Sequence, residues 1–200
     1  ADFVDIATAT APRLRTRAKM RWDDDWLYVA AEMEEPDIWA TLTEHNSVIF
    51  HDSDFEVFVD ANATTHFYKE FEVNAFGTTW DLCLNRPYDD GGYENSTRVF
   101  PGRGFDMQPP TRNAVKISPA AAINNPKVRG AGWTVEVALP LRELALNSTG
   151  AMPSEGTFWR LGFSRVEWNV VVDEKTGQYK KEPSCQSCAK PGTPAEDNWV

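Results

Sequence analysis

Two runs of alternating apolar and polar residues, separated by a short polar loop, dominate the middle of the chain. Residues 55–60 read Phe-Glu-Val-Phe-Val-Asp, and a similar alternation covers residues 67–74 after the turn-prone segment at 61–65. A period of two on both sides of a short polar loop predicts a β-hairpin. One face of this hairpin is hydrocarbon and aromatic. The other face carries six polar side chains: Glu56, Asp60, Tyr68, Glu70, Glu72 and Asn74.

The same alternation recurs along the rest of the chain and predicts a mostly antiparallel β-sandwich. The expected elements are a hairpin over 17–22 and 26–33, strands over 78–84, 115–117, 132–139 and 158–168, a helical turn over 141–146, and a hairpin or loop over 169–181. Prolines and glycines between 85 and 110 predict a long loop there, and residues 170–200 read as a loop-rich C-terminal segment. We therefore expect one all-β domain over residues 1–200, with jelly-roll or immunoglobulin-like layers.

Composition narrows the classes of partner. The chain has 200 residues, of which 42% are hydrophobic, and its formal net charge is -10. This acidity disfavours nucleic acids and anionic membranes, because phosphate binding needs clustered Lys and Arg. No apolar run is long enough to span a membrane, and the first residues lack the charged start and apolar middle of a signal peptide. Neutral ligands and cations fit this composition better.

Three N-x-S/T sequons lie in segments that read as loops, at Asn62, Asn95 and Asn147. Three loop sequons exceed the roughly one expected by chance, and they indicate a secreted, N-glycosylated protein. Cys185 and Cys188 form a C-x-x-C in a loop rich in Pro and Lys, without the strand and helix that surround a thioredoxin-like redox motif. We expect either a small disulfide between them or one bond to Cys83 with a thiol left over.

Aromatic and planar polar side chains are the residues that a sugar needs from its receptor, because a sugar has an apolar C–H face and a rim of hydroxyls. Trp80 and Trp168 each end a β pattern beside polar residues, and we interpret both as candidate stacking surfaces. Candidate partners for the hydroxyls are Glu70, Glu72, Asn74 and Arg165, for which a solvated or salt-bridged strand face is the alternative. We expect core packing for the tryptophans inside apolar rows, Trp22, Trp133 and Trp159, and leave Trp39 open.

Besides the acidic turn of Asp23, Asp24 and Asp25, metal binding has two candidate residue sets. Asp52, Asp54, Glu56 and Asp60 lie within nine residues and could hold calcium, although they lack the twelve-residue EF-hand pattern and a plain acidic turn is the alternative. The other set comprises the three scattered histidines, His45, His51 and His66, of which the first two flank one segment. Solvated loop histidines are the alternative there.

Catalytic motifs are weak. The thirty acidic residues make any glycosidase-like carboxylate pair uninformative, since a pair can be chosen freely among them. Ser164 does not sit in a G-x-S-x-G elbow, and no H-E-x-x-H occurs in the chain. We therefore expect a protein that is not an enzyme.

Several long motifs, taken in order, resemble those of a known protein family. They are RWDDDWLYVAAEMEEPDIWATLTEHNSVIFHDSDFEVFVD, YKEFEVNAFGTTWDL, PYDDGG, GWTVEVALP, WRLGFSRVEW and EDNWV. In order and spacing the chain from Arg17 to Val200 resembles the carbohydrate-binding module family 9-like domain. The resemblance implies a two-sheet β-sandwich of extracellular proteins without catalytic residues. For sugar-binding members it also implies a glycan-end site with aromatic walls and structural calcium.

The resemblance is incomplete at both ends. Members of the family usually begin with a further segment containing an I-D-G-like start and continue past D-N-W-V into a last strand, so we expect a domain that lacks its first and last family strands. The function expected is a secreted, non-catalytic module that binds a glycan by aromatic stacking and hydrogen bonds. One alternative is a structural adhesion domain of an extracellular assembly that packs against other subunits. Another is a haem-binding cytochrome-type sandwich, with Met20, Met33 or Met107 and His51 or His66 as ligands.

Overall fold

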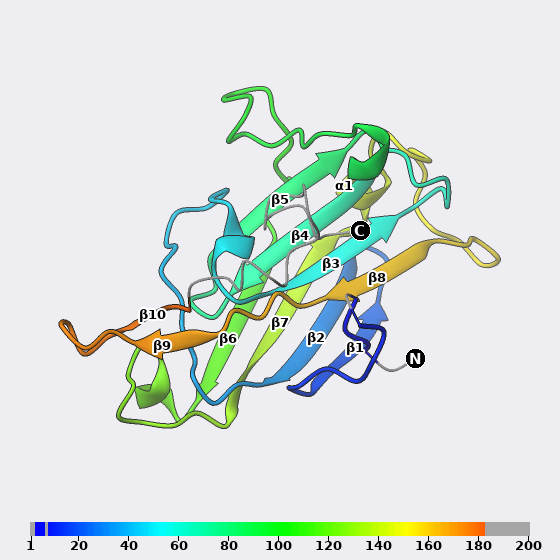
Figure 1. The fold of residues 1–200 in the computed structure, drawn as a ribbon. Coiled ribbons are helices and arrows are strands. Elements are labelled where there is room, and N and C mark those ends of the chain that lie inside the picture. Colours follow the sequence, from blue (N-terminus) through cyan, green and yellow to red (C-terminus); the bar gives the residue numbers. More distant parts are fainter. Residues whose placement is uncertain (1–2, 7, 183–200) are drawn as a thin grey trace.

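Two four-stranded antiparallel sheets stacked face to face form the body of the computed structural model, which describes residues 3–6 and 8–182 (Figure 1). The first sheet has the order β1 (Thr16–Trp22), β2 (Trp26–Glu34), β7 (Gly132–Pro140) and β6 (Arg112–Ser118). The second has the order β5 (Thr79–Leu84), β4 (Tyr68–Asn74), β3 (Asp54–Asp60) and β8 (Arg160–Ser164). The predicted all-β sandwich is confirmed.

The remaining elements are short. A two-stranded ribbon pairs β9 (Val170–Val172) with β10 (Tyr179–Lys181), and one helical turn, α1 (Leu141–Ala145), follows β7. Three single turns of 3-10 helix are η1 (Ile49–His51), η2 (Tyr88–Asp90) and η3 (Ala120–Ala122). Within the described part of the chain, no helix has the length and apolar character needed to cross a membrane.

The strands lie close to their predicted positions, and the differences have local causes. β3 and β4 form the predicted central hairpin, with Glu56 opposite Glu72. β6 is longer than predicted, and its exposed residues alternate with half-buried ones from Arg112 to Ser118 along the edge of the first sheet. β8 is shorter than predicted. Beyond Ser164 the chain leaves the ladder, although the Val166 amide still donates to the carboxyl group of Asp54.

The core fills the space between the two sheets. The second sheet contributes Phe55, Val57, Val59, Phe71 and Val73, and the first sheet contributes Leu27, Val29, Ala31, Met33, Trp133, Val135, Val137 and Leu139. These positions are every second residue of their strands, because side chains alternate between the two faces of a sheet. Each sheet therefore has one apolar inner face, and the outer face of each sheet is left for other side chains.

Trp22 corrects one prediction. The sequence places it in an apolar row and predicts core packing, but the side chain is 69% exposed. Trp22 pairs with the buried Leu27 and shares its face of the sheet, yet it lies at the end of the edge strand β1. Exposure on this face of β1 rises from buried Thr16 through Ala18 to Met20 and Trp22. The facing sheet therefore does not reach the end of β1.

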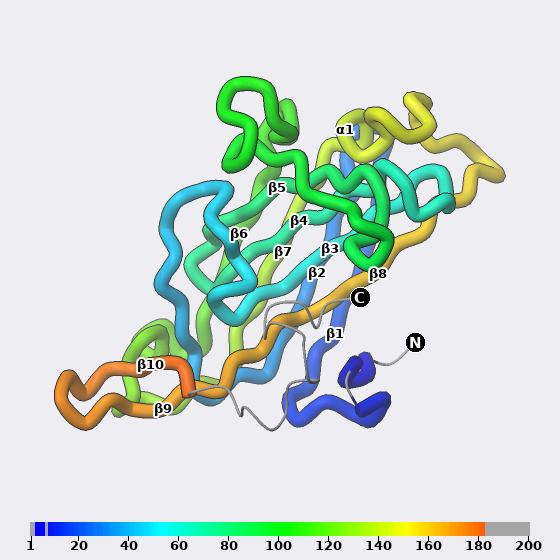
Figure 2. Tube along the Cα trace, turned by 45° about the horizontal axis from the view of Figure 1, so that its top comes forward, coloured from blue at the N-terminus to red at the C-terminus, as the bar shows by residue number. Residues whose placement is uncertain are grey.

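Two long connections border the second sheet (Figure 2). Residues 35–53 join β2 to β3 and run beside β5, whereas residues 85–111 join β5 to β6 and cross over the end of β5 and β4. The second connection corresponds to the long loop predicted from its prolines and glycines. Phe105 and Met107 anchor this loop in the core.

The core packing generates a prediction of stability. Phe55→Ala should lower the free energy of unfolding by about 3–5 kcal/mol, because it removes a fully buried ring and leaves a cavity. The matched control is Phe76→Ala, which should change it by less than about 1 kcal/mol since Phe76 is 44% exposed. Urea unfolding of both variants measures the difference. Equal losses in the two variants would contradict the assignment of the core.

Candidate functional site

The outer face of the second sheet carries a compact set of acidic side chains. Glu56 on β3 lies directly opposite Glu72 on β4, and Glu56 is also opposite Ser164 on β8. Glu72 is in turn opposite Trp80 on β5. One row of the sheet thus runs through Ser164, Glu56, Glu72 and Trp80, with Glu70 in the adjacent row. We name Asp54, Glu56, Glu70 and Glu72 the four-carboxyl cluster.

The four-carboxyl cluster is buried, with exposures of 0–5%. Two backbone amides donate to it: Phe50 N to Glu72 Oε2 at 3.0 Å and Val166 N to Asp54 Oδ1 at 3.1 Å. The remaining carboxyl oxygens are less well satisfied. Asp54 Oδ2 and Glu70 Oε2 are buried and have no hydrogen-bond partner among the described residues. Buried polar atoms usually have partners, so these two oxygens mark a place where a donor or a cation would be favourable.

Burial raises the pKa of every carboxyl group in the cluster, because a charge is poorly solvated there. The pKa of Glu56 rises to about 7. For Asp54, Glu70 and Glu72, repulsion by neighbouring carboxylates raises the pKa further. None of the ion pairs in the described part of the chain includes any of the four groups.

Aromatic side chains flank the four-carboxyl cluster. Trp168 is half-buried, its Nε1 donates to Phe50 O at 2.7 Å, and Lys181 Nζ lies 3.7 Å from the centre of its ring. Trp80 is buried at 3% exposure, with the Arg98 guanidinium 5.3 Å from its ring and Phe50 6.0 Å away. Trp168 therefore presents more ring surface than Trp80. The indole Nε1 of Trp80 has no hydrogen-bond partner in the described part of the chain.

Asn74 and Asp52 form a structural network beside this face. Asp52 accepts hydrogen bonds from Thr41 N, Leu42 N and Thr41 Oγ1, each at 2.8 Å, and from Asn74 Nδ2 at 2.9 Å. Asn74 Nδ2 also donates to Leu42 O, while Asn74 Oδ1 accepts from Phe76 N and Thr78 N. These bonds hold the β2–β3 connection against the β4–β5 turn. Both side chains are engaged before any ligand arrives.

Arg165 and Asp60 also have internal partners. Arg165 Nη2 contacts Glu35 at 3.0 Å and Glu167 at 2.5 Å and donates to Glu34 O, which ties the chain after β8 to the end of β2. Asp60 accepts from Thr64 N and Thr65 N and so fixes the β3–β4 turn.

Of the acidic residues predicted to hold calcium, the structure brings Asp54 and Glu56 together, and it adds Glu72 to them. One ligand atom from each of these three residues lies within 4.8 Å of the other two. The donor set consists of oxygens, and Asp54 Oδ2 is buried without a partner, so the residues fit a hard cation such as Ca²⁺. Asp52 and Asp60 would need to give up their present hydrogen bonds to join it.

The sequons and cysteines fall in different environments. Asn62 lies in the β3–β4 turn, where its Oδ1 accepts from Thr64, and Asn147 follows α1. Asn95 is partly buried, and its backbone amide bonds to Cys83 O. Cys83 is buried and free, whereas Cys185 and Cys188 lie outside the described residues.

The residues considered as haem ligands lie in contrasting environments. Met33 and Met107 are packed in the apolar core, whereas Met20, His51 and His66 are exposed. His66 Nδ1 is bonded to the carbonyl of Thr64 within the same turn. A haem iron needs both of its axial ligands beside one pocket, so the separation of Met33 and Met107 from the exposed histidines disfavours haem ligation by these two methionines.

Three residues near the cluster were missed in the sequence, namely Phe50, Tyr88 and Arg98. Tyr88 lies in the 85–111 loop and is 45% exposed, while desolvation of its hydroxyl and the nearby carboxylates of Glu70 and Glu72 raise the pKa of that hydroxyl. Arg98, from the same loop, pairs with Glu94 and covers Trp80. These residues lie in irregular segments, where no periodicity reveals which way a side chain points. The only signal was their aromatic or charged character beside turn residues.

The chain is similar to solved structures at low sequence identity. In structure it is similar to a protein of Bacteroides uniformis ATCC 8492 that is described only provisionally as carbohydrate-binding, with 14% identity, a TM-score of 0.54, and coverage of 77% of this chain and 64% of that one. It is also similar to a carbohydrate binding module family 9 from Caldicellulosiruptor kristjanssonii. The complex with cellotriose has 19% identity and a TM-score of 0.46, and the match covers 78% of this chain and 59% of that one. The complex with glucose has 18% identity and a TM-score of 0.44, and the match covers 78% of this chain and 60% of that one.

The matches cover only part of the length of each solved structure. The chain spans less than two thirds of each of these structures, with 64%, 59% and 60% of their lengths covered. No curated protein sequence matches it. The family model described as carbohydrate family 9 binding domain-like matches residues 2–182, which is most of the chain. The chain therefore belongs to the carbohydrate family 9 binding domain-like family.

Proposed function

We propose that the outer face of sheet β5-β4-β3-β8 binds a carbohydrate without changing it chemically. The observation that carries this proposal is the four-carboxyl cluster, whose buried groups include two oxygens without a hydrogen-bond partner. Sugar hydroxyls are neutral donors and could satisfy such oxygens without a counter-ion. Membership in a carbohydrate-binding family supports the same ligand class.

The roles of individual residues follow from their positions. Glu70 and Glu72 accept hydrogen bonds from ring hydroxyls, and Glu56 extends this acceptor surface toward β8. Trp168 supplies an aromatic surface for the C–H face of a sugar, because its ring is only half-buried while its Nε1 is already bonded to Phe50. Trp80 is buried and borders the same face on the β5 side. Asn74 and Arg165 shape the surrounding loops through their internal bonds.

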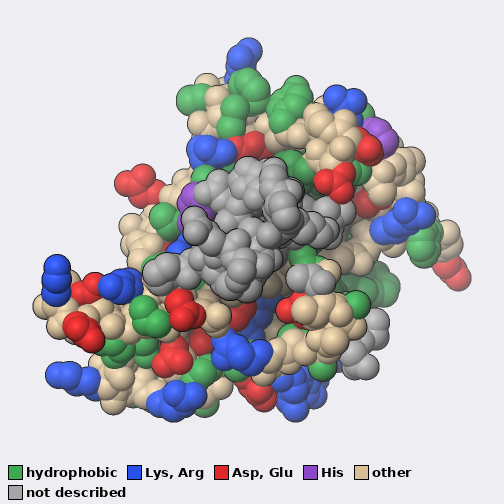
Figure 3. Space-filling view, in the orientation of Figure 1, with side chains coloured by type: hydrophobic (Ala, Val, Ile, Leu, Met, Phe, Trp, Pro, Cys, Tyr) green, Lys and Arg blue, Asp and Glu red, His purple; other side chains and the backbone are tan. Residues whose placement is uncertain are grey.

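The charge of the chain is consistent with a neutral ligand. Basic side chains are spread around the edge of the molecule, and those at the β9–β10 end lie among acidic ones (Figure 3). A carboxylate-rich face repels anions such as phosphorylated or sulfated glycans. A neutral glycan is therefore part of the proposal.

A hard cation is a second candidate for the same face, favoured by the close approach of ligand oxygens from Asp54, Glu56 and Glu72. When bound, Ca²⁺ would neutralise the carboxylates and could itself coordinate sugar hydroxyls. The two candidates are separable, because titration of the protein with Ca²⁺ alone reports on the cation and titration with a sugar in the presence of a chelator reports on direct recognition.

A secreted location with N-glycans completes the proposal. Asn62 and Asn147 lie in turns away from the four-carboxyl cluster, in the β3–β4 turn and after α1. Glycans at these positions would leave the outer face of the sheet open to a ligand.

Substitutions on the face should weaken carbohydrate binding. Glu72→Gln should lower the affinity for an oligosaccharide by about 10–100-fold, the range for a hydrogen bond to a charged group, and Trp168→Ala should have an effect of similar size. The exposed Trp22, on the other sheet, provides the matched control, and Trp22→Ala should leave the affinity unchanged. A glycan array selects the ligand, and calorimetric titration measures the affinity. An equal affinity in all three variants would remove this face from the site.

The raised pKa of Glu56 predicts how stability depends on pH. A carboxyl group whose folded pKa is about 7 stabilises the fold most below its ordinary value of 4.5, and this contribution is lost as the pH rises through 7. The free energy of unfolding should therefore fall as the pH rises from about 4.5 to about 7. Glu56→Gln should reduce that fall by roughly 1–3 kcal/mol, because glutamine remains neutral.

Urea unfolding across this pH range measures the effect. Glu155→Gln is the control, since Glu155 is exposed and its replacement should leave the pH dependence as it is. A pH dependence that Glu56→Gln does not change would show that Glu56 titrates normally in the folded protein.

A further inference from the structure

We propose that His45, Asp81 and Asp106 form a binding site for a first-row divalent metal ion such as Zn²⁺. One ligand atom from each residue lies within 4.8 Å of those of the other two. The residues come from three separate parts of the chain: the 35–53 connection, β5 and the 85–111 loop. Asp81 and Trp80 are consecutive on β5 and point to opposite faces of the sheet, so this site is distinct from the four-carboxyl cluster.

Asp81 is the feature that points to a ligand. The side chain is 1% exposed, and its Oδ2 accepts from Met107 N at 3.1 Å. Its other oxygen, Oδ1, is buried and has no hydrogen-bond partner within residues 3–6 and 8–182. A buried carboxylate oxygen without a donor is unfavourable unless a proton or a cation meets it.

His45 presents its ring to the carboxylates in an orientation suited to a metal. Nδ1 lies 2.8 Å from Thr79 Oγ1, so an Nδ1–H can donate to this hydroxyl and leave the Nε2 lone pair free. Nε2 lies 3.1 Å from Asp106 Oδ1. Two atoms bound to one Zn²⁺ at about 2.0–2.2 Å are roughly 3–3.5 Å apart, so this pair is already at a suitable separation. A metal ion could bind with small side-chain movements.

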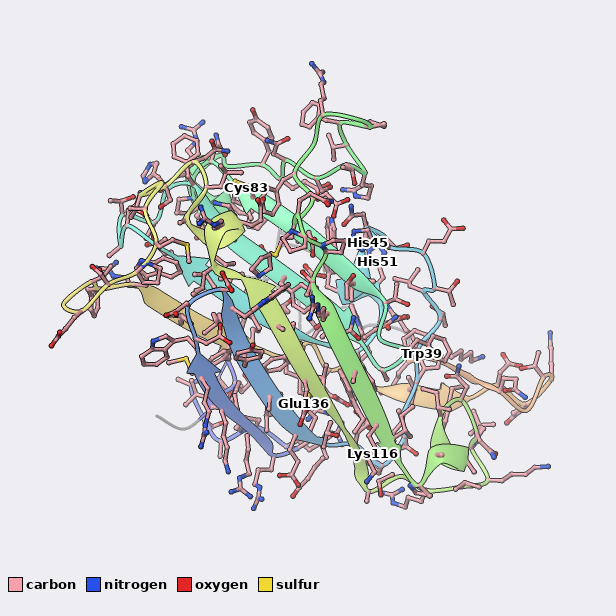
Figure 4. The ribbon with its side chains drawn as sticks, turned by 180° about the vertical axis from the view of Figure 1, so that it is seen from behind. Trp39, His45, His51, Cys83, Lys116 and Glu136 are labelled. Atoms are coloured by element: carbon pink, nitrogen blue, oxygen red, sulfur yellow. The ribbon has the colours of Figure 1, made fainter. Side chains whose placement is uncertain are left out.

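The neighbours of His45 and Asp106 fix both residues against Asp81. Asn46, next to His45, donates its backbone amide to Thr79 O at 2.8 Å and accepts from Asp81 N at 3.0 Å through Oδ1. Met107, next to Asp106, donates to the Asp81 side chain. Figure 4 shows His45 where the 35–53 connection meets the long loop. The site is therefore preorganised by bonds that do not involve its own ligand atoms, apart from the second oxygen of Asp81.

The chemistry of the donors selects the class of metal. One imidazole with two carboxylates suits Zn²⁺ and its first-row neighbours, whereas Ca²⁺ and Mg²⁺ prefer oxygen donors throughout. His45 also lines an open hollow of about 360 Å³, together with Glu44, Asn46, Ser47, Thr97 and Arg98. The hollow gives a metal ion access from solvent and room for a water ligand.

A proton shared between Asp81 and Asp106 is the alternative to a metal ion at this site. The pKa of Asp81 is raised to about 6, chiefly by burial, with a contribution from the Asp106 carboxylate and an opposing one from His45. Protonation would relieve the repulsion between the two carboxylates but would not require His45. Dependence on the imidazole therefore separates the metal from the proton.

The test is calorimetric titration of chelator-treated protein with Zn²⁺. Cys185→Ser and Cys188→Ser are included in every protein used, because thiolates bind Zn²⁺ strongly. One Zn²⁺ per chain should bind, and His45→Ala and Asp106→Asn should each weaken the affinity at least about tenfold. Thr79→Val should weaken it by about tenfold through the lost orientation of the ring. Circular dichroism checks that each variant is folded.

The matched control is His66→Ala, which removes an exposed histidine from the β3–β4 turn and should leave Zn²⁺ affinity unchanged. Ca²⁺ titrated in the same way should bind equally well to the protein with and without His45→Ala, because the oxygen donors of the four-carboxyl cluster are the candidate Ca²⁺ site. Absence of saturable Zn²⁺ binding, or a Zn²⁺ affinity that neither His45→Ala nor Asp106→Asn changes, would overturn the proposal.

Discussion

The antiparallel pairing of β3 with β4 and β8 is the constraint on which the rest of the structure depends. Its register sends Phe55 and Val57 to the core and Glu56 to the opposite face. A slip by one residue would exchange the two faces, which would put carboxylates into the sandwich and phenylalanine outside. The apolar core therefore determines which side chains meet on the outer face.

This constraint has an energetic cost. Like charges directly opposite each other on neighbouring strands repel, and the pair Glu56 and Glu72 occupies such a position. Burial of Asp54 and Glu70 beside them adds the cost of desolvation. Because core packing holds the strands in register, the repulsion cannot be relieved by shifting the pairing. Protonation, hydrogen-bond donors or a cation must relieve it, and this requirement is what suits the face to bind a ligand.

The strands and their inner faces could be predicted from the sequence because alternation is a local signal. The same period placed Glu70 and Glu72 on one face with Glu56. Contacts to loop backbone leave no such signal, so it could not be foreseen that Asn74 and Asp52 hold the β2–β3 connection or that Asp60 fixes a turn. Trp22 shows a related difficulty, because alternation gives the face of a residue but not where the opposite sheet ends.

Contacts between distant loops could not be predicted from the sequence, for a different reason. His45 and Asp106 are 61 positions apart, in segments without periodicity. Arg98 reaches Trp80 from the same long loop. Only the folded backbone brings such residues together. The sequence could thus indicate which residue types were available for chemistry, while their grouping required the structure.

The central claim is that the outer face of sheet β5-β4-β3-β8 is the carbohydrate-binding surface. A crystal structure of the protein with the oligosaccharide that it binds most tightly tests this claim most directly. The account predicts sugar hydroxyls within hydrogen-bond distance of Glu70 and Glu72, with a sugar ring beside Trp168. A sugar bound on the outer face of sheet β1-β2-β7-β6, with the four-carboxyl cluster untouched, would contradict it.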